Sequence, residues 1–264
     1  MNIEQADQAR QDPTYRKALV ELLYQLADDE LCLGHRDSEW LGVAPDLEGD
    51  VAFSSIAQDE VGHAIFHLER LHELGEADPD TLAFSRGLNE RRNAVLMERP
   101  NGDWAKTILR HFLYDMFDDV RTEALLASSY RPLAQGMAKI QREEYYHLLH
   151  LKLWFIRLAR GGGEARHRME QALAEVWPEV GDLFSLGEGE EELLRHGLIQ
   201  CGSGELMHRW VERVKPVFQE AELLWPGLPP QPELQGRSGE HTQDLAEMIR
   251  TLSEVYTSDP AACW

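Results

Sequence analysis

The sequence predicts an all-α protein, and two observations support this fold class. Apolar residues recur every three or four positions through most of the 264 residues, and no segment alternates convincingly with the period of a strand. Hydrophobic residues make up 43% of the chain and charged residues 28%, as is ordinary for a globular protein with a large core. Long segments with helical period are separated by glycine and proline, which predicts a bundle of helices.

Four long helices are expected in the first 160 residues. Asp12 and Pro13 resemble an N-cap followed by proline at the first helical position. Gly75 and the Gly161–Gly163 run are strong signals for the ends of two helices. A crossover with some helix in its middle joins the second helix to the third. The predicted helices span about 13–37, 47–74, 103–128 and 131–160.

The second half of the chain is also expected to be helical, with two irregular stretches. A Gly/Glu-rich turn follows Phe184, and residues 226–239 are too rich in proline and glycine for regular structure, so they are expected to wrap the surface. Thr242 is a candidate N-cap for the last helix. Helices are predicted at about 164–184, 204–225 and 242–256. We expect one domain over residues 1–264, with a bundle core at about 13–160 and a helical extension at about 164–264.

The charge and the cysteines restrict the class of protein. A net charge of −21 argues against nucleic-acid binding and disfavours anionic membranes. The polar N-terminus does not resemble a signal peptide, and no apolar run is long enough to cross a bilayer. Cys32, Cys201 and Cys263 are scattered and odd in number, which favours free thiols. A cytoplasmic protein is the expectation, with no nucleic-acid or membrane partner.

The inward stripe of each long helix is apolar except at its middle. A single Glu-x-x-His motif is weak evidence, because any pair three residues apart shares a helix face. Here the motif occurs twice, and each of the other two helices carries an acid at the same level. In chain order these residues are Glu30, Glu60 with His63, Asp115, and Glu144 with His147.

Buried acids in this number repel one another unless they are protonated or bind cations. The order Glu, Glu-x-x-His, Asp, Glu-x-x-His is typical of ferritin-like dimetal bundles. Glu30 and Glu60 are 30 residues apart and Asp115 and Glu144 are 29 apart, so two helical hairpins would bring them to matching heights. Oxygen and imidazole ligands favour a dinuclear iron site, with manganese as the alternative. Asp119, one turn after Asp115, is the rival ligand on the third helix.

Two further acids directly precede the motif glutamates. Asp59 and Glu143 could each accept the N–H of an imidazole, either on their own helix or on the facing helix, and so orient it. The competing interpretation is that both are ordinary surface acids on long helices.

The motif segments resemble a known family. QDEVGHAIFHLERLHELG and REEYYHLLHLKLW are similar to the two metal-binding helices of phenylacetyl-CoA epoxidases, and the pattern continues to GRSGEHTQDLAEMIRTLSEVY near the C-terminus. Within the phenylacetate-degradation PaaA/PaaC family, the wider pattern is most similar to the PaaC-type subunit. The resemblance implies a homologous catalytic PaaA-type subunit, further epoxidase subunits, a reductase as electron donor and phenylacetyl-CoA as substrate. The PaaC-type subunit is usually regarded as structural with its ligands lost, whereas this chain retains the whole set.

Three functions therefore remain open. The chain is either an epoxidase subunit with a dimetal site, a non-catalytic scaffold that pairs with a catalytic homologue, or a ferritin-like handler of iron or peroxide. The helical half that follows the bundle favours an oxygenase subunit over a minimal ferritin. A homo-oligomer or hetero-oligomer is expected.

Overall fold

The computed structural model, which describes residues 2–259 and 262, confirms the all-α prediction. Four long helices lie close to their predicted bounds, and side-chain caps begin three of them. Asp12 accepts hydrogen bonds from the amides of Thr14 and Tyr15 ahead of α2, and Asp46 and Asp103 cap α3 and α6 in the same way. The four helices are α2 (Pro13–Ser38), α3 (Leu47–Glu73), α6 (Trp104–Leu125) and α7 (Arg131–Arg160).

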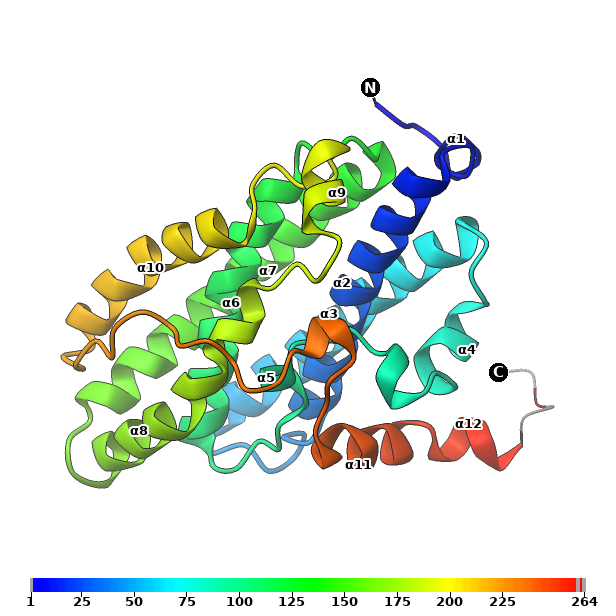
Figure 1. The fold of residues 1–264 in the computed structure, drawn as a ribbon. Coiled ribbons are helices and arrows are strands. Elements are labelled where there is room, and N and C mark those ends of the chain that lie inside the picture. Colours follow the sequence, from blue (N-terminus) through cyan, green and yellow to red (C-terminus); the bar gives the residue numbers. More distant parts are fainter. Residues whose placement is uncertain (1, 260–261, 263–264) are drawn as a thin grey trace.

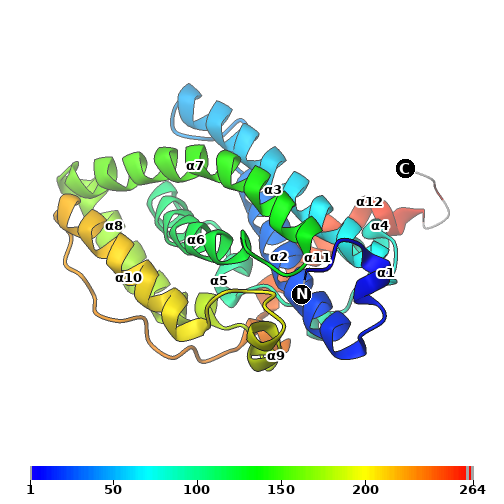
Figure 2. The same ribbon diagram turned by 90° about the horizontal axis from the view of Figure 1, so that it is seen from above.

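These helices form two antiparallel hairpins, α2 with α3 and α6 with α7 (Figure 1). Seen from above, α3 and α7 lie next to each other on one side of the bundle (Figure 2). Leu19, Phe53 and Phe112 are fully buried, as their stripes predicted, and so is Phe155 of α7, which was not on the predicted stripe. The crossover between the hairpins contains the expected helix, as α4 (Pro79–Phe84), the 3-10 helix η1 (Leu88–Glu90) and α5 (Val95–Glu98).

The C-terminal helices cover the α6/α7 hairpin and then return to the first. Trp210 is fully buried, and its indole N–H donates to the carbonyl of Leu113 in α6 at 3.0 Å. Residues 226–235 form no regular element and cross the surface between α10 and α11, as expected (Figure 1). The elements are α8 (Gly163–Val176), η2 (Trp177–Phe184), α9 (Glu190–Arg195), α10 (Ser203–Glu220), η3 (Gly236–Ser238), α11 (Gln243–Leu252) and α12 (Glu254–Ser258).

Some predicted elements were wrong in detail. The expected Gly/Glu-rich turn contains α9, because three acids in its first turn suit the positive end of the helix dipole. The short α1 (Ala6–Ala9) was not expected, and the last predicted helix is divided at Ser253. Cys32 and Cys201 are free thiols, as predicted, whereas Cys263 lies outside the described residues.

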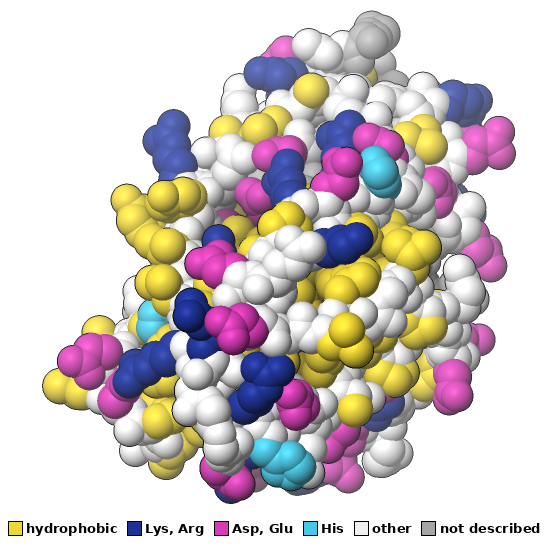
Figure 3. All heavy atoms as spheres, turned by 90° about the vertical axis from the view of Figure 1, so that its left-hand side faces the viewer, with side chains coloured by type: hydrophobic (Ala, Val, Ile, Leu, Met, Phe, Trp, Pro, Cys, Tyr) yellow, Lys and Arg dark blue, Asp and Glu magenta, His cyan; other side chains and the backbone are white. Residues whose placement is uncertain are grey.

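The surface carries both charge signs. On the face shown in Figure 3, apolar side chains gather in patches between Lys or Arg and Asp or Glu side chains. Among the described residues, every helix is too short or too polar to span a bilayer.

Candidate metal centre

The predicted acids and histidines meet in the middle of the bundle. Apolar side chains lie above and below them on the same stripes, and each functional side chain is almost completely buried. Glu30, Glu60, His63, Glu144 and His147 are all at most 5% exposed.

Four of these residues converge on one point. Glu30, Glu60, His63 and Glu144 each offer one ligand atom, and these four atoms lie within 4.8 Å of one another. His147 adjoins the same group, because its Nδ1 is 3.2 Å from Glu60 Oε1 and 3.2 Å from Glu144 Oε1. Five of the six predicted ligands therefore share one small volume, and they come from α2, α3 and α7.

The acids next to the motif glutamates hold the imidazoles of the facing helices. His63 Nε2 in α3 donates to Glu143 Oε2 in α7 at 3.0 Å, and His147 Nε2 in α7 donates to Asp59 Oδ2 in α3 at 3.2 Å. This reciprocal arrangement turns both Nδ1 atoms toward the carboxylates. A hydrogen bond to the remote nitrogen is how metal-ligating histidines are normally oriented.

The atoms that point into the cluster are the ones without hydrogen-bond partners. Glu30 Oε2, both carboxylate oxygens of Glu60 and Glu144 Oε1 are buried without a partner, as are Nδ1 of His63 and of His147. Buried polar atoms are normally satisfied, so a group of them facing one point requires an explanation. A bound cation would satisfy all of them, and the donor set of carboxylates and imidazoles suits iron or manganese.

The electrostatics of the cluster also indicate a cation site. Burial, together with the neighbouring Glu144 and Glu30, raises the pKa of Glu60 well above its usual value. Burial alone would lower the pKa of each histidine, but the carboxylates outweigh it and raise the pKa of His63 to about 12 and that of His147 to about 10. Protons thus supply, in the metal-free protein, the positive charge that the carboxylates require.

Asp115, the predicted ligand on α6, is held by a buried histidine. His111 Nδ1 donates to Asp115 Oδ1 at 2.7 Å, and His111 Nε2 donates to Asp37 Oδ2 at 2.8 Å. The other oxygen of Asp115, Oδ2, is buried without a partner. Asp115 is thus outside the four-residue group but keeps one oxygen available for a metal.

Asp119, the rival on α6, lies in a different environment. It is half-buried and forms an ion pair with Arg213 of α10, which also pairs with Glu123. The structure therefore brings Glu30, Glu60, His63, Glu144 and His147 together, places Asp115 beside His111, and directs Asp119 toward α10.

Sequence reasoning missed a buried cation on the α2/α6 side. The guanidinium of Arg121 in α6 donates to Asp29 Oδ2 at 2.8 Å and to Asp118 Oδ1 at 2.9 Å. Its Nη2 donates to the hydroxyl of Tyr114 at 2.9 Å and lies 3.9 Å from Glu30 Oε1. An arginine beside a candidate ligand reduces the net negative charge of the cluster. The spacing of the motifs does not predict this arginine.

A second residue that the sequence did not predict anchors the C-terminal segment beside the cluster. Arg237 in η3 is buried, and its Nη1 and Nη2 donate to the two oxygens of Asp29 at 2.8 Å each. Asp29 directly precedes Glu30, so this bidentate pair fixes the backbone that carries a candidate ligand.

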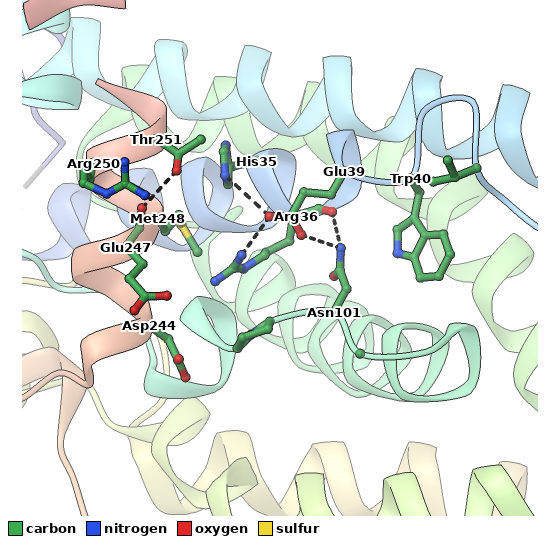
Figure 4. Close-up of a pocket in the computed structure, with 13 residues that line it drawn as sticks. His35, Arg36, Glu39, Trp40, Asn101, Asp244, Glu247, Met248, Arg250 and Thr251 are labelled. Carbon is green, nitrogen blue, oxygen red and sulfur yellow. Dashed lines mark hydrogen bonds and ion pairs between the residues drawn. The ribbon is translucent and has the colours of Figure 1, made fainter. Parts of the chain in front are cut away.

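A separate hollow of about 550 Å³ lies away from the cluster, between the end of α2 and α11 (Figure 4). Its buried Arg36 is already engaged, because Nη1 donates to Glu39 and Nη2 to the carbonyl of Glu98. The amide of Asn101 donates to the same Glu39 carboxylate and to the carbonyl of Arg36. These internal pairs make the hollow a structural junction.

Fold and site together define a ferritin-like helical bundle with a carboxylate–histidine cluster able to hold a metal ion. The chain belongs to the phenylacetic acid catabolic protein family, whose model matches residues 1–264. It is 33% identical over 243 residues to the C subunit of 1,2-phenylacetyl-CoA epoxidase from Escherichia coli (strain K12), covering 91% of this chain and 96% of that relative. It is 27% identical over 220 residues to the A subunit of the same epoxidase, covering 81% of this chain and 70% of that relative.

Proposed function

We propose that this chain is a cytoplasmic subunit of a multicomponent phenylacetyl-CoA epoxidase and holds a dinuclear iron centre. The observation that carries the proposal is the buried group of partnerless carboxylate and imidazole atoms in a chain that belongs to this family over its whole length. Manganese is the second candidate metal, because the donor atoms are the same.

The proposed ligands divide between the four bundle helices. Glu60 with His63 and Glu144 with His147 would hold the metal from α3 and α7, and Glu30 would hold it from α2. Asp115 would complete the set from α6 through its partnerless Oδ2. When bound, a reduced iron pair supplies activation of O₂ for transfer of one oxygen atom to an aromatic ring.

The surrounding residues prepare the site for this chemistry. Glu143 and Asp59 hold the remote N–H groups of the two histidines and so fix both imidazoles with Nδ1 inward. The fully buried Phe53 and Phe112 on the bundle stripes exclude bulk water. Arg121 balances Asp29 and Asp118, and Oε2 of Glu30, which has no hydrogen-bond partner, would serve as the ligand atom.

The partners proposed for the chain follow from the two relatives. A homologous PaaA-type subunit, other epoxidase subunits and a reductase would form the complex, and phenylacetyl-CoA would be the substrate. A scaffold role is the second candidate function, because the match to the C subunit of the epoxidase is stronger and covers more of both chains than the match to its A subunit.

Co-expression with a PaaA-type homologue tests the proposal. We expect the two chains to co-purify in fixed ratio, and the complex to consume O₂ and phenylacetyl-CoA when a reductase supplies electrons. A Glu60→Ala/His147→Ala variant should assemble normally but lose the activity that depends on this chain. Unchanged activity in that variant would leave only the scaffold role, and failure to co-purify would contradict both.

A further inference from the structure

A second set of buried polar atoms without partners continues from the candidate metal centre along α3. Both ring nitrogens of His67 are buried without a hydrogen-bond partner, and so are Nε of Arg70 and the hydroxyl of Tyr130. His67 and Tyr130 are fully buried, and His67 lies one helical turn after His63. None of the three is a candidate ligand, so a metal ion does not account for these atoms.

His67 is a costly side chain for a dry position in a helical bundle. An imidazole always carries a donor, an acceptor or both, and each buried polar group left unpaired costs about 1–3 kcal/mol. Its buried neighbours on α3 are apolar, namely Ala64, Leu68 and Leu71. A leucine in place of His67 would bury no polar group, so the imidazole indicates a polar group between the helices that bonds to it.

The electrostatics around His67 favour water as that polar group. Burial, followed by the positive charges of His63, Arg121 and Arg70, lowers the pKa of His67 well below its usual value. The imidazole is therefore neutral, with one nitrogen a donor and the other an acceptor. The same positive charges disfavour a second cation here, whereas a water molecule both donates and accepts.

Tyr130 belongs to the same series, although it lies in another part of the chain. α3 and α7 lie side by side and run antiparallel, as their two reciprocal acid–imidazole pairs show (Figure 2). The ring of Phe66 in α3 rests on Gly136 in α7, where a Cβ would clash with it. Tyr130, six residues before Gly136, is therefore level with Arg70 and Glu73. Burial raises the pKa of Tyr130 to about 12, with Glu73 adding to the shift and Arg70 opposing it.

The steps between these groups are short enough for water to bridge, and the series ends at solvent. At 1.5 Å of rise per residue, His63 and His67 are about 6 Å apart along α3, and His67 and Arg70 about 4.5 Å. One water molecule with two hydrogen bonds spans about 5–6 Å. The side chain of Arg70 is 21% exposed, and its Nη2 is 2.9 Å from Glu73, which is 44% exposed.

We propose that His67, Arg70 and Tyr130 hold a chain of internal water molecules that carries protons between solvent at the C-terminal end of α3 and the candidate metal centre. The purpose of this route rests on the proposed function. Transfer of one oxygen atom of O₂ to a ring, with release of the other as water, consumes two electrons and two protons. The reductase would supply the electrons, and the route would supply the protons. His67 touches neither metal nor substrate, so it is a positioning residue that acts through water.

A crystal structure of the metal-free full-length chain, at a resolution that shows ordered water, tests the binding site directly. We expect water within about 3.2 Å of both ring nitrogens of His67, and further water at Arg70 Nε and the Tyr130 hydroxyl. Apolar contacts alone around both nitrogens of His67 would overturn the inference.

Stopped-flow mixing of the metal-free chain with Mn²⁺ and a pH indicator tests proton movement. Metal binding releases protons from its ligands, and in the parent chain the release should be slower in D₂O. His67→Leu should slow the release at least about tenfold. The number of protons released should stay the same, because every candidate ligand is retained. Tyr130→Phe keeps the packing and should also slow the release, so it tests the route if His67→Leu fails to fold.

His150→Leu is the matched control. His150 Nε2 is also buried without a partner, three residues after His147 in α7. Its ring lies 6.3 Å from that of Phe53, seven residues before Glu60, so it is on the other side of the cluster. The proton release in His150→Leu should match that of the parent chain.

Three kinetic results would contradict the route. They are equal slowing by His67→Leu and His150→Leu, an unchanged rate in both His67→Leu and Tyr130→Phe, and a fall in rate that occurs only with a fall in the number of protons released. Failure of the parent chain to bind Mn²⁺ would instead count against the proposed function, and the crystal structure would still decide whether His67 holds water.

Discussion

The two sides of the candidate metal centre are built in different ways. On the α3/α7 side, each helix supplies a Glu-x-x-His pair, and each imidazole is held by one acid from the facing helix. On the α2/α6 side, each helix supplies a single acid within a dense network of buried ion pairs, in which Arg121 has a central place. We call the α3/α7 side, whose inward atoms have no hydrogen-bond partner, the open side, and the α2/α6 side, which contains its own arginines, the closed side.

The difference shows how each side meets the cost of burying charge. The α3/α7 side leaves its inward atoms partnerless, so that a metal or protons must supply positive charge. The α2/α6 side carries its own positive charge, in Arg121 and Arg237 around Asp29. We therefore expect substitutions on the α3/α7 side mainly to change metal affinity. Substitutions on the α2/α6 side should mainly change the free energy of unfolding.

The largest expected effect is a loss of stability caused by a substitution on the closed side. Arg121→Met leaves Asp118 buried without its cation and leaves Asp29 with Arg237 alone, so the free energy of unfolding should fall by about 3–5 kcal/mol. Urea unfolding measures this loss. Arg213→Met is the matched control, because its partner Asp119 is half-buried and its partner Glu123 is exposed, so the loss should be about 1 kcal/mol or less. Equal losses in the two variants would remove the distinction between the sides.

An intermediate effect is expected from the acids of the open side. Asp59→Asn and Glu143→Gln each leave an imidazole without its carboxylate partner, and metal affinity should fall about 10–100-fold with the fold intact. Competition with a chelator measures the affinity. Asp80→Asn, on the exposed surface of α4, provides the control. An unchanged affinity in both variants would show that these acids are surface charges only.

A smaller and graded effect is expected from pH. The folded metal-free protein raises the pKa of His63 to about 12 and that of His147 to about 10, above the unfolded value of about 6.5. Their contribution to stability is therefore complete below about pH 6.5, and it is lost as pH rises from there to about 10 for His147 and about 12 for His63.

A metal ion must displace these protons. Its affinity should therefore rise about tenfold per pH unit between pH 6 and 9 for each proton released. Titration of the metal-free chain with Mn²⁺ at several pH values measures the slope. A flat profile would mean that neither imidazole is a ligand.

The same comparison explains how far the sequence could predict this molecule. Helical period, the cap at Asp12 and the glycines at the helix ends were enough to predict the long helices, and the repeated Glu-x-x-His was enough to predict the open side. Arg121 and Arg237 could not be predicted, because their partner Asp29 is 92 and 208 residues away along the chain and, unlike Asp59 and Glu143, neither arginine lies next to a motif residue. Ion pairs of that range depend on the packing of several elements and leave no local pattern.

The open side also shows what spacing alone leaves undecided. The sequence left Asp59 and Glu143 either as surface acids or as partners of an imidazole on their own or the facing helix, and both hold the facing one. The helical spacing of the stripe on α6 predicts at what height an acid faces the cluster. It does not distinguish Asp115 from Asp119, whose environments differ because one pairs with His111 and the other with Arg213.

The central claim is that the buried carboxylates and imidazoles tolerate one another because they hold metal ions. Elemental analysis of the purified, iron-loaded chain beside the Glu60→Ala/His147→Ala variant tests it most directly. We predict stoichiometric iron in the parent chain, two ions per chain for a full dinuclear centre, and its loss in the variant. Equal trace amounts of metal in both proteins would contradict the claim and leave a helical bundle whose acids are balanced by protons and arginine alone.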